Sequence, residues 1–123
     1  NTESLITIIG CGGDRDKSKR PLMAKVACNL STQVIITSDN PRSESPEEII
    51  KDMMIGLDPI QKKKVLEITD RRQAIMTAGK LAQDNDIILL AGKGHEKYQE
   101  IKGKKFLFDD MDELKQSLKI ILK

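Results

Sequence analysis

Four consecutive residues combine side chains that suit recognition of a charged small molecule. Asp39, Asn40, Pro41 and Arg42 place an acid, an amide, a rigid proline and a guanidinium together. A guanidinium binds a carboxylate through two parallel hydrogen bonds, and Asp and Asn oxygens accept from an ammonium group. The proline restricts the backbone, so less order is lost on binding. The same segment also suits an Asx-turn without any ligand, and these four residues alone do not decide between the two.

Two glycine-rich segments carry further charges. Gly10–Lys19 contains Asp14, Arg15, Asp16 and Lys17, and Gly92–Glu96 contains Lys93, His95 and Glu96. Glycine lets a ligand approach the backbone closely, and a helix start attracts anions. The first segment lacks the third glycine of a dinucleotide fingerprint and the Gly-Lys-Ser/Thr ending of a Walker A loop. A turn with solvated charges is the alternative interpretation of this segment.

The residues of a nucleophilic triad are mostly missing. His95 is the single histidine, and neither Ser nor Cys occupies a nucleophile elbow. Cys11 and Cys28 show no metal-ligand spacing. A lone histidine in a loop is more often a hydrogen-bonding residue than a general base.

The composition is typical of one globular domain, and it shows no sign of binding to nucleic acid or to a membrane. The chain has 123 residues and a formal net charge of +2, with acidic and basic residues interspersed. Only three aromatic residues occur, which argues against a stacking surface for nucleic acid. Since no apolar run approaches the roughly 20 residues of a membrane helix, and no signal peptide is visible, we expect a cytoplasmic protein.

Short β-branched runs alternate with helical patterns along the chain. Strands are predicted at residues 5–9, 34–37, 65–68 and 87–91, and helices at residues 21–29, 46–55 and 71–82. Ser45 with Glu48, and Asp70 with Gln73, read as capping boxes, and Gly56 and Pro59 as a helix stop.

The order of elements predicts an α/β fold. Nearly continuous apolar strands separated by helices indicate a mainly parallel sheet with helices on both faces. Residues 98–101 and 105–108 suggest a C-terminal hairpin at the sheet edge, followed by a helix from about residue 110. Because ligands bind beyond the carboxyl ends of parallel strands, the three polar segments should share one edge.

Taken together, the segments at residues 10–23, 39–42 and 91–96 resemble the C-terminal domain of the Mur ligases, and among them the members that add diaminopimelate. The resemblance runs over nearly the whole chain in the same order. It implies a Rossmann-like fold and a single domain, residues 1–123, that lacks the family's first strand–helix unit.

The resemblance also implies the chemistry. ATP phosphorylates a carboxylate of the UDP-MurNAc-L-Ala-D-Glu substrate, and the amine of meso-diaminopimelate displaces the phosphate. Mg²⁺ and a carbamylated lysine belong to the central domain of such enzymes, so this chain is expected to contribute no metal ligand or catalytic residue. The central and N-terminal domains are the implied partners, and the chain alone is expected to be inactive.

Site residues follow from the same resemblance. Asp39, Asn40, Pro41 and Arg42 correspond to the diaminopimelate recognition motif, with Arg42 on the distal carboxylate. A further set completes the amino-acid pocket: Arg15, Gly92 and Glu96. Asp14 corresponds to an acid that contacts the ATP ribose. Lysine-adding members lack the arginine, which would repel a terminal ammonium.

Three alternatives remain open at this point. The pocket can serve a non-catalytic small-ligand-binding module, or the polar loops can be loops of a structural domain. A related ligase, such as folylpolyglutamate synthase, would share fold and ATP, but has no evident reason to keep residues 39–42 and Glu96 together.

Overall fold

The computed structural model describes residues 4–14, 16–83, 86–91, 98–101 and 104–107, with side chains in the first three ranges. Ten helices and strands fall within these ranges, in the order β1-α1-β2-α2-α3-β3-α4-β4-β5-β6. The alternation of strands and helices confirms the predicted α/β class.

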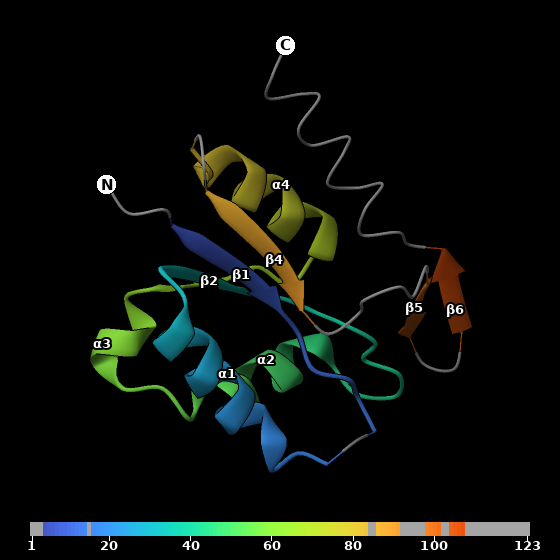
Figure 1. Cartoon of the computed structure of the whole chain (residues 1–123). Helices are drawn as coiled ribbons and strands as arrows, with labels where there is room; N and C mark the ends of the chain where they lie inside the picture. Colours follow the sequence, from blue (N-terminus) through green and yellow to red (C-terminus); the bar gives the residue numbers. More distant parts are fainter. Residues whose placement is uncertain (1–3, 15, 84–85, 92–97, 102–103, 108–123) are drawn as a thin grey trace.

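Four strands form one parallel sheet, in the order β3-β2-β1-β4 (Figure 1). They are β1 (Leu5–Ile9), β2 (Gln33–Ile36), β3 (Val65–Glu67) and β4 (Ile87–Ala91). Ile9, the last residue of β1, pairs with Ile36 of β2 and Ala91 of β4. The loops that follow these strands therefore leave from one edge of the sheet, as the sequence predicted.

Helices cover both sides of this sheet (Figure 1). One side carries α1 (Lys19–Leu30), α2 (Pro46–Met54) and α3 (Pro59–Lys62), and the other carries α4 (Arg71–Leu81). Within the described part of the chain, no helix is long and apolar enough to cross a membrane.

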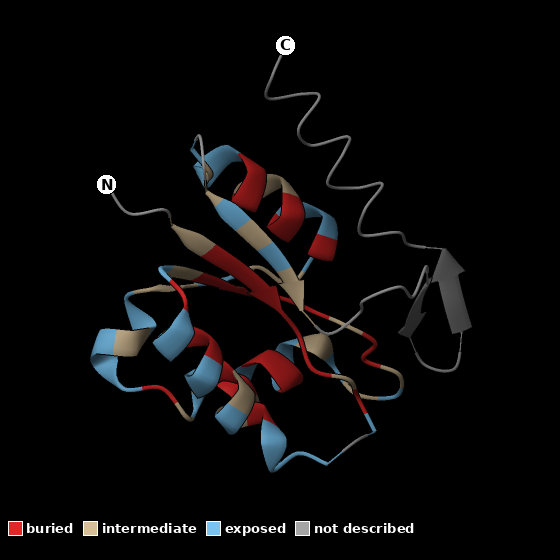
Figure 2. Ribbon diagram, in the orientation of Figure 1, coloured by how far each residue is buried: buried red, intermediate tan, exposed pale blue. Residues whose placement is uncertain are grey.

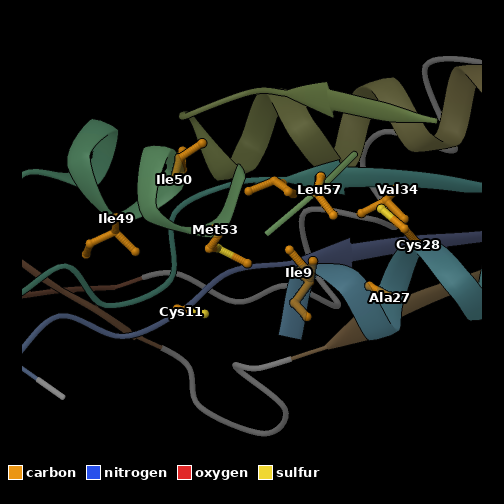
Figure 3. Close-up of a cluster of buried hydrophobic side chains, with 11 residues drawn as sticks. Ile9, Cys11, Ala27, Cys28, Val34, Ile49, Ile50, Met53 and Leu57 are labelled. Atoms are coloured by element: carbon orange, nitrogen blue, oxygen red, sulfur yellow. The ribbon is translucent and has the colours of Figure 1, made fainter. Parts of the chain in front are cut away.

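The core consists of two clusters, one on each face, because neighbouring strand residues point to opposite faces. Ile9, Val34 and Ile36 pack with residues of α1 and α2 (Figure 3). Ile6, Ile8 and Ile35 pack instead with the alanines and Ile75 of α4. Figure 2 shows these strands as the most buried part of the molecule. Each fully buried isoleucine contributes about 1.5–3 kcal/mol to folding.

Two predictions at helix starts differ from the structure, one for α1 and one for α2. α1 begins at Lys19, two residues before the predicted start at Pro21, since a proline is tolerated anywhere in a first turn whose N–H groups lack helical partners. Ser45 is the N-cap of α2 as predicted, but the capping box with Glu48 does not form. The Ser45 hydroxyl instead donates to Glu47 Oε1 at 3.0 Å, a nearer acceptor.

In the sequence, Pro59 was interpreted only as the stop of the preceding helix. Pro59 is also the first residue of the short helix α3, which was therefore not predicted. Asp58 caps this short helix, because its Oδ1 accepts from the Gln61 N–H at 2.7 Å. Gln61 Oε1 accepts in return from the Asp58 N–H at 3.0 Å. Asp70 is the N-cap of α4 as predicted, but its side chain accepts from the Arg72 N–H at 3.0 Å and the predicted capping box with Gln73 does not form.

The predicted hairpin is present as β5 (Tyr98–Ile101) and β6 (Lys104–Leu107), which pair antiparallel. The two strands form a two-stranded sheet of their own, apart from the four hydrogen-bonded strands of the main sheet. The helix predicted from about residue 110 lies outside the described residues.

An apolar groove of about 430 Å³ runs between α1 and the face of β1 and β4. Its aliphatic lining includes side chains that remain well exposed: Leu22, Val26, Leu30 and Leu89. Parallel sheets are normally covered on both faces, so this face is unusual for the fold.

Candidate functional site

Two loops at the carboxyl edge of the sheet form the candidate site. The first loop, residues 10–18, joins β1 to α1, and the second loop, residues 37–45, joins β2 to α2. Residues 92–96, the third polar segment predicted for this edge, lie outside the described residues. Because β1 and β2 are neighbours in register, their loops start side by side.

Gly13 is the point of closest approach between the two loops. Its N–H donates to the carbonyl oxygen of Asn40 at 2.7 Å. A Cβ at Gly13 would lie 1.8 Å from the carbonyl oxygen of Pro41, so no other residue fits without separating the loops. Asn40 is 2% exposed and Pro41 is also buried, so the recognition motif is packed tightly on the first loop.

Arg42 lies across the junction of the loops. Its Nη1 donates to the carbonyl oxygen of Gly13 at 3.0 Å and to that of Asn40 at 3.3 Å. The backbone of Arg42 is left-handed, with φ of 53°. A non-glycine residue pays for this conformation and keeps it only where the surroundings enforce it, a situation common at binding sites.

Asp14 fastens the first loop to the turn that follows Arg42. Its Oδ1 accepts from the Ser43 hydroxyl at 2.5 Å, and its Oδ2 from the Ser43 N–H at 3.3 Å. Asp14 is also left-handed, with φ of 55°, a region that aspartate tolerates better than most residues. The carboxylate is exposed and has capacity for further donors.

Arg20 is a buried cation that ties both loops to α2. It is 1% exposed, and both terminal nitrogens donate to Glu44, at 3.1 and 2.8 Å. Nη2 also donates to the carbonyl oxygen of Gly12 at 3.1 Å, and Nη1 to Asp52 at 2.9 Å. The paired carboxylates compensate the cost of burying the charge.

Glu44 receives bonds from both loops. Besides Arg20, the N–H of Asp14 donates to its Oε2 at 2.5 Å, and Lys17 lies 3.7 Å from its Oε1. The hydrogen bonds from Arg20, followed by that from Asp14, lower the pKa of Glu44 from its ordinary 4.5 to about 2. Glu44 is therefore ionised throughout the physiological range.

A cavity of about 410 Å³ lies beside the junction and is within the size range of small-ligand sites. Its polar lining includes Asp16, Lys19 and Asp39. Cys11 also lines it, but burial raises the pKa of this thiol to about 11, so it is neutral and a poor nucleophile.

Several structural contributors were missed from the sequence. No pattern in the sequence assigned a role to Glu44, and Arg20 was interpreted as a solvated charge. Arg71 is 1% exposed at the start of α4, and its Nη1 donates to the carbonyl oxygen of Ser38 at 3.0 Å. A single sequence carries no signal that would mark these arginines as buried.

The structure thus brings together Asp14 and residues 39–42 of the predicted site. Arg15, Gly92 and Glu96 lie outside the described residues, so their place in the pocket stays a prediction. Among the described residues, no group of three His, Cys, Asp or Glu side chains converges in a way that could hold a metal ion.

A family model, curated relatives and a solved structure that match this chain all come from the Mur ligases. The family model described as "Mur ligase, glutamate ligase domain" matches residues 1–94. The UDP-N-acetylmuramoyl-L-alanyl-D-glutamate–2,6-diaminopimelate ligase of Bacteroides thetaiotaomicron is 61% identical over 112 residues, covering 91% of this chain and 23% of that protein. The enzyme of the same name from Clostridium botulinum is 49% identical over 117 residues, covering 95% and 24%.

A solved structure of a ligase of this name superposes with a TM-score of 0.92 at 46% identity. The match covers 99% of this chain and 25% of the other. The chain thus spans about a quarter of the length of the relatives it matches. The family model matches residues 1–94, and the fold of the chain superposes over nearly the whole chain. The chain therefore belongs to the Mur ligase family, in which it corresponds to the glutamate ligase domain.

Proposed function

We propose that this chain is the amino-acid-binding C-terminal domain of an ATP-dependent ligase. The ligase adds meso-diaminopimelate to UDP-MurNAc-L-Ala-D-Glu in the cytoplasmic synthesis of peptidoglycan precursor. The observation that carries the proposal is the position of Arg42, whose guanidinium is held by the carbonyl groups of Gly13 and Asn40 in the two loops. Similarity to ligases of that name supports it.

The charges at the junction complement the proposed substrate. Diaminopimelate carries a carboxylate and an ammonium group at each end. The planar guanidinium of Arg42 suits the distal carboxylate, and the carboxylate of Asp39, which lines the neighbouring cavity, suits an ammonium. Asn40 and Pro41 are buried, and they keep the backbone of the motif in one conformation. A site organised before binding loses less entropy when the ligand arrives.

Arg15, Gly92 and Glu96 complete the proposed pocket. A second arginine and a second acid match the second carboxylate and ammonium of diaminopimelate. Glycine at position 92 leaves room for the ligand to approach the backbone. Asp14 is proposed as a contact for the ATP ribose, which its exposed carboxylate suits, although both oxygens already accept from Ser43.

The contribution of this chain to the reaction is binding and orientation. ATP, with Mg²⁺, supplies the activation of the acceptor carboxylate. Arg42 and Asp39 fix the charged groups of diaminopimelate so that its reacting amine can face that carboxyl carbon. Positioning of this kind removes part of the barrier by replacing an encounter in solution with a bound geometry.

The remaining domains of the same polypeptide are the proposed partners. The relatives are about four times as long as this chain, which leaves room for ATP-binding and UDP-sugar-binding domains. The apolar groove beside α1 supports a further proposal, that a preceding strand–helix unit of the domain packs there. Such a unit would bury Leu22, Val26 and Leu89.

Replacing Arg42 tests the proposed function. L-lysine is the right probe, because it is diaminopimelate without the distal carboxylate. In the full-length ligase, Arg42→Ala should lower kcat/KM for meso-diaminopimelate roughly 30-fold or more, which corresponds to a loss of about 2–5 kcal/mol. The slow reaction with lysine should not fall, because the variant no longer repels the terminal ammonium of lysine.

Lys80→Ala is the matched control, since Lys80 is an exposed cation in the last turn of α4, far from the carboxyl edge. It should change neither rate. An Arg42→Ala enzyme that retains its preference for diaminopimelate over lysine would remove the basis of the proposal, as would an unsubstituted enzyme that does not ligate diaminopimelate.

A further inference from the structure

The conformation of Arg42 requires an explanation beyond its own contacts. Its φ of 53° is unfavourable for a side chain of this size, and it coexists with the left-handed Asp14 in the facing loop. Strained residues of this kind persist only where neighbouring interactions enforce the backbone. The two carbonyl contacts of Arg42 hold the guanidinium, and something else must hold the turn.

That turn closes at Glu44. The N–H of Glu44 donates to the carbonyl oxygen of Pro41 at 2.9 Å, so residues 41–44 form a turn with Arg42 as its second residue. The carboxylate of Glu44 accepts from the N–H of Asp14, so the same residue also touches the strained position of the first loop. Glu44 therefore contacts both unusual backbone segments.

Arg20 in turn fixes Glu44. Two hydrogen bonds between the guanidinium and the two carboxylate oxygens set the carboxylate plane, and a third bond to Gly12 adds the first loop. The side chain of Arg20 is 2% exposed and that of Glu44 is 18% exposed, so solvent competes little for this pair. Arginine suits this role because its planar fork matches a carboxylate at two points.

We propose that Arg20 and Glu44 act as positioning residues that hold the turn of Arg42 in its binding conformation. The proposal rests on the proposed function, since it assigns Arg42 to the distal carboxylate of diaminopimelate. Neither residue is assigned a substrate contact. Breaking the pair lets the turn relax to ordinary backbone angles, and Arg42 leaves the junction.

Asp52 provides an internal control. It accepts from Arg20 Nη1 at 2.9 Å, as Glu44 does, but it belongs to α2. Glu44→Gln and Asp52→Asn are isosteric changes that each remove one charge from the same buried cation. Both should cost stability, and only the first disturbs the turn.

The test measures kcat and KM of the full-length ligase with meso-diaminopimelate and with L-lysine, together with thermal unfolding. We expect Glu44→Gln to lower the preference for diaminopimelate at least tenfold, mainly through KM, and Asp52→Asn to leave it within twofold. An unchanged preference in Glu44→Gln, or equal losses in both variants, would overturn the positioning role.

Two further outcomes are informative. If the unsubstituted enzyme does not ligate diaminopimelate, the proposed function fails, whereas a positioning failure alone leaves that activity intact. If Glu44→Gln does not fold, Glu44→Asp replaces it, because aspartate keeps the negative charge beside Arg20 and is one methylene too short to bond both Arg20 and the Asp14 N–H as Glu44 does. The same tenfold loss is expected of Glu44→Asp, and an unchanged preference contradicts the proposal.

Discussion

Replacing Gly13 with alanine should separate the two loops of the candidate site. The added Cβ would lie 1.8 Å from the carbonyl oxygen of Pro41 and 2.5 Å from its carbonyl carbon, whereas Cβ atoms essentially never approach other atoms within 3.0 Å. Both contacts are with backbone, so no side chain can rotate away. The loops must therefore separate by roughly 1 Å, which is beyond the tolerance of close packing.

Two hydrogen bonds are lost in that movement, from Gly13 to Asn40 and from Arg42 to Gly13. At about 0.5–1.5 kcal/mol each, the free energy of unfolding should fall by about 1–3 kcal/mol. The rate of ligation should fall by about 100-fold, because a displacement of about 1 Å in a positioned group can cost that much.

The assay combines urea unfolding with kcat/KM for meso-diaminopimelate in the full-length ligase. Asp58→Ala is the control, because it removes the cap of α3, away from both loops. It should lower stability and leave the preference for diaminopimelate over lysine unchanged. A Gly13→Ala enzyme with unaltered stability and unaltered kcat/KM would refute the tight junction on which the site depends.

Two other predictions concern stability. Because the bond with Arg20 lowers the pKa of Glu44 from 4.5 to about 2, its contribution is fully present above about pH 4.5 and is lost as the pH falls toward 2. Glu44→Gln should flatten that decline in urea unfolding followed against pH, and an equally steep decline would contradict the assignment. Asp58→Ala removes the capping box with Gln61 and should cost about 1 kcal/mol in thermal unfolding with unchanged ligand preference; a stability equal to that of the unsubstituted protein would count against the cap.

The strands of the sheet could be predicted because each is a short apolar run ended by glycine, proline or a polar turn. β1 and β4 have the predicted bounds, and β2 and β3 differ by a residue at their ends. The common edge followed from parallel pairing alone. The amino-acid sequence was therefore sufficient to place residues 39–42 and Asp14 together.

Contacts between distant residues could not be predicted in this way. Arg20 lies in a run of charges that is typical of an exposed loop, yet its acidic partners Glu44 and Asp52 are 24 and 32 residues away. The close approach of Gly13 to Pro41 depends on the register of two strands. The left-handed backbone of Arg42 is likewise a consequence of packing, since arginine has no intrinsic preference for it.

A crystal structure of the full-length ligase with bound meso-diaminopimelate tests the central claim most directly. We expect the carboxylate farther from the reacting amine to lie within hydrogen-bonding distance of the Arg42 guanidinium, beside Asp39 at the carboxyl edge of β1 and β2. A diaminopimelate molecule bound elsewhere, with no atom in contact with Arg42, would contradict the account.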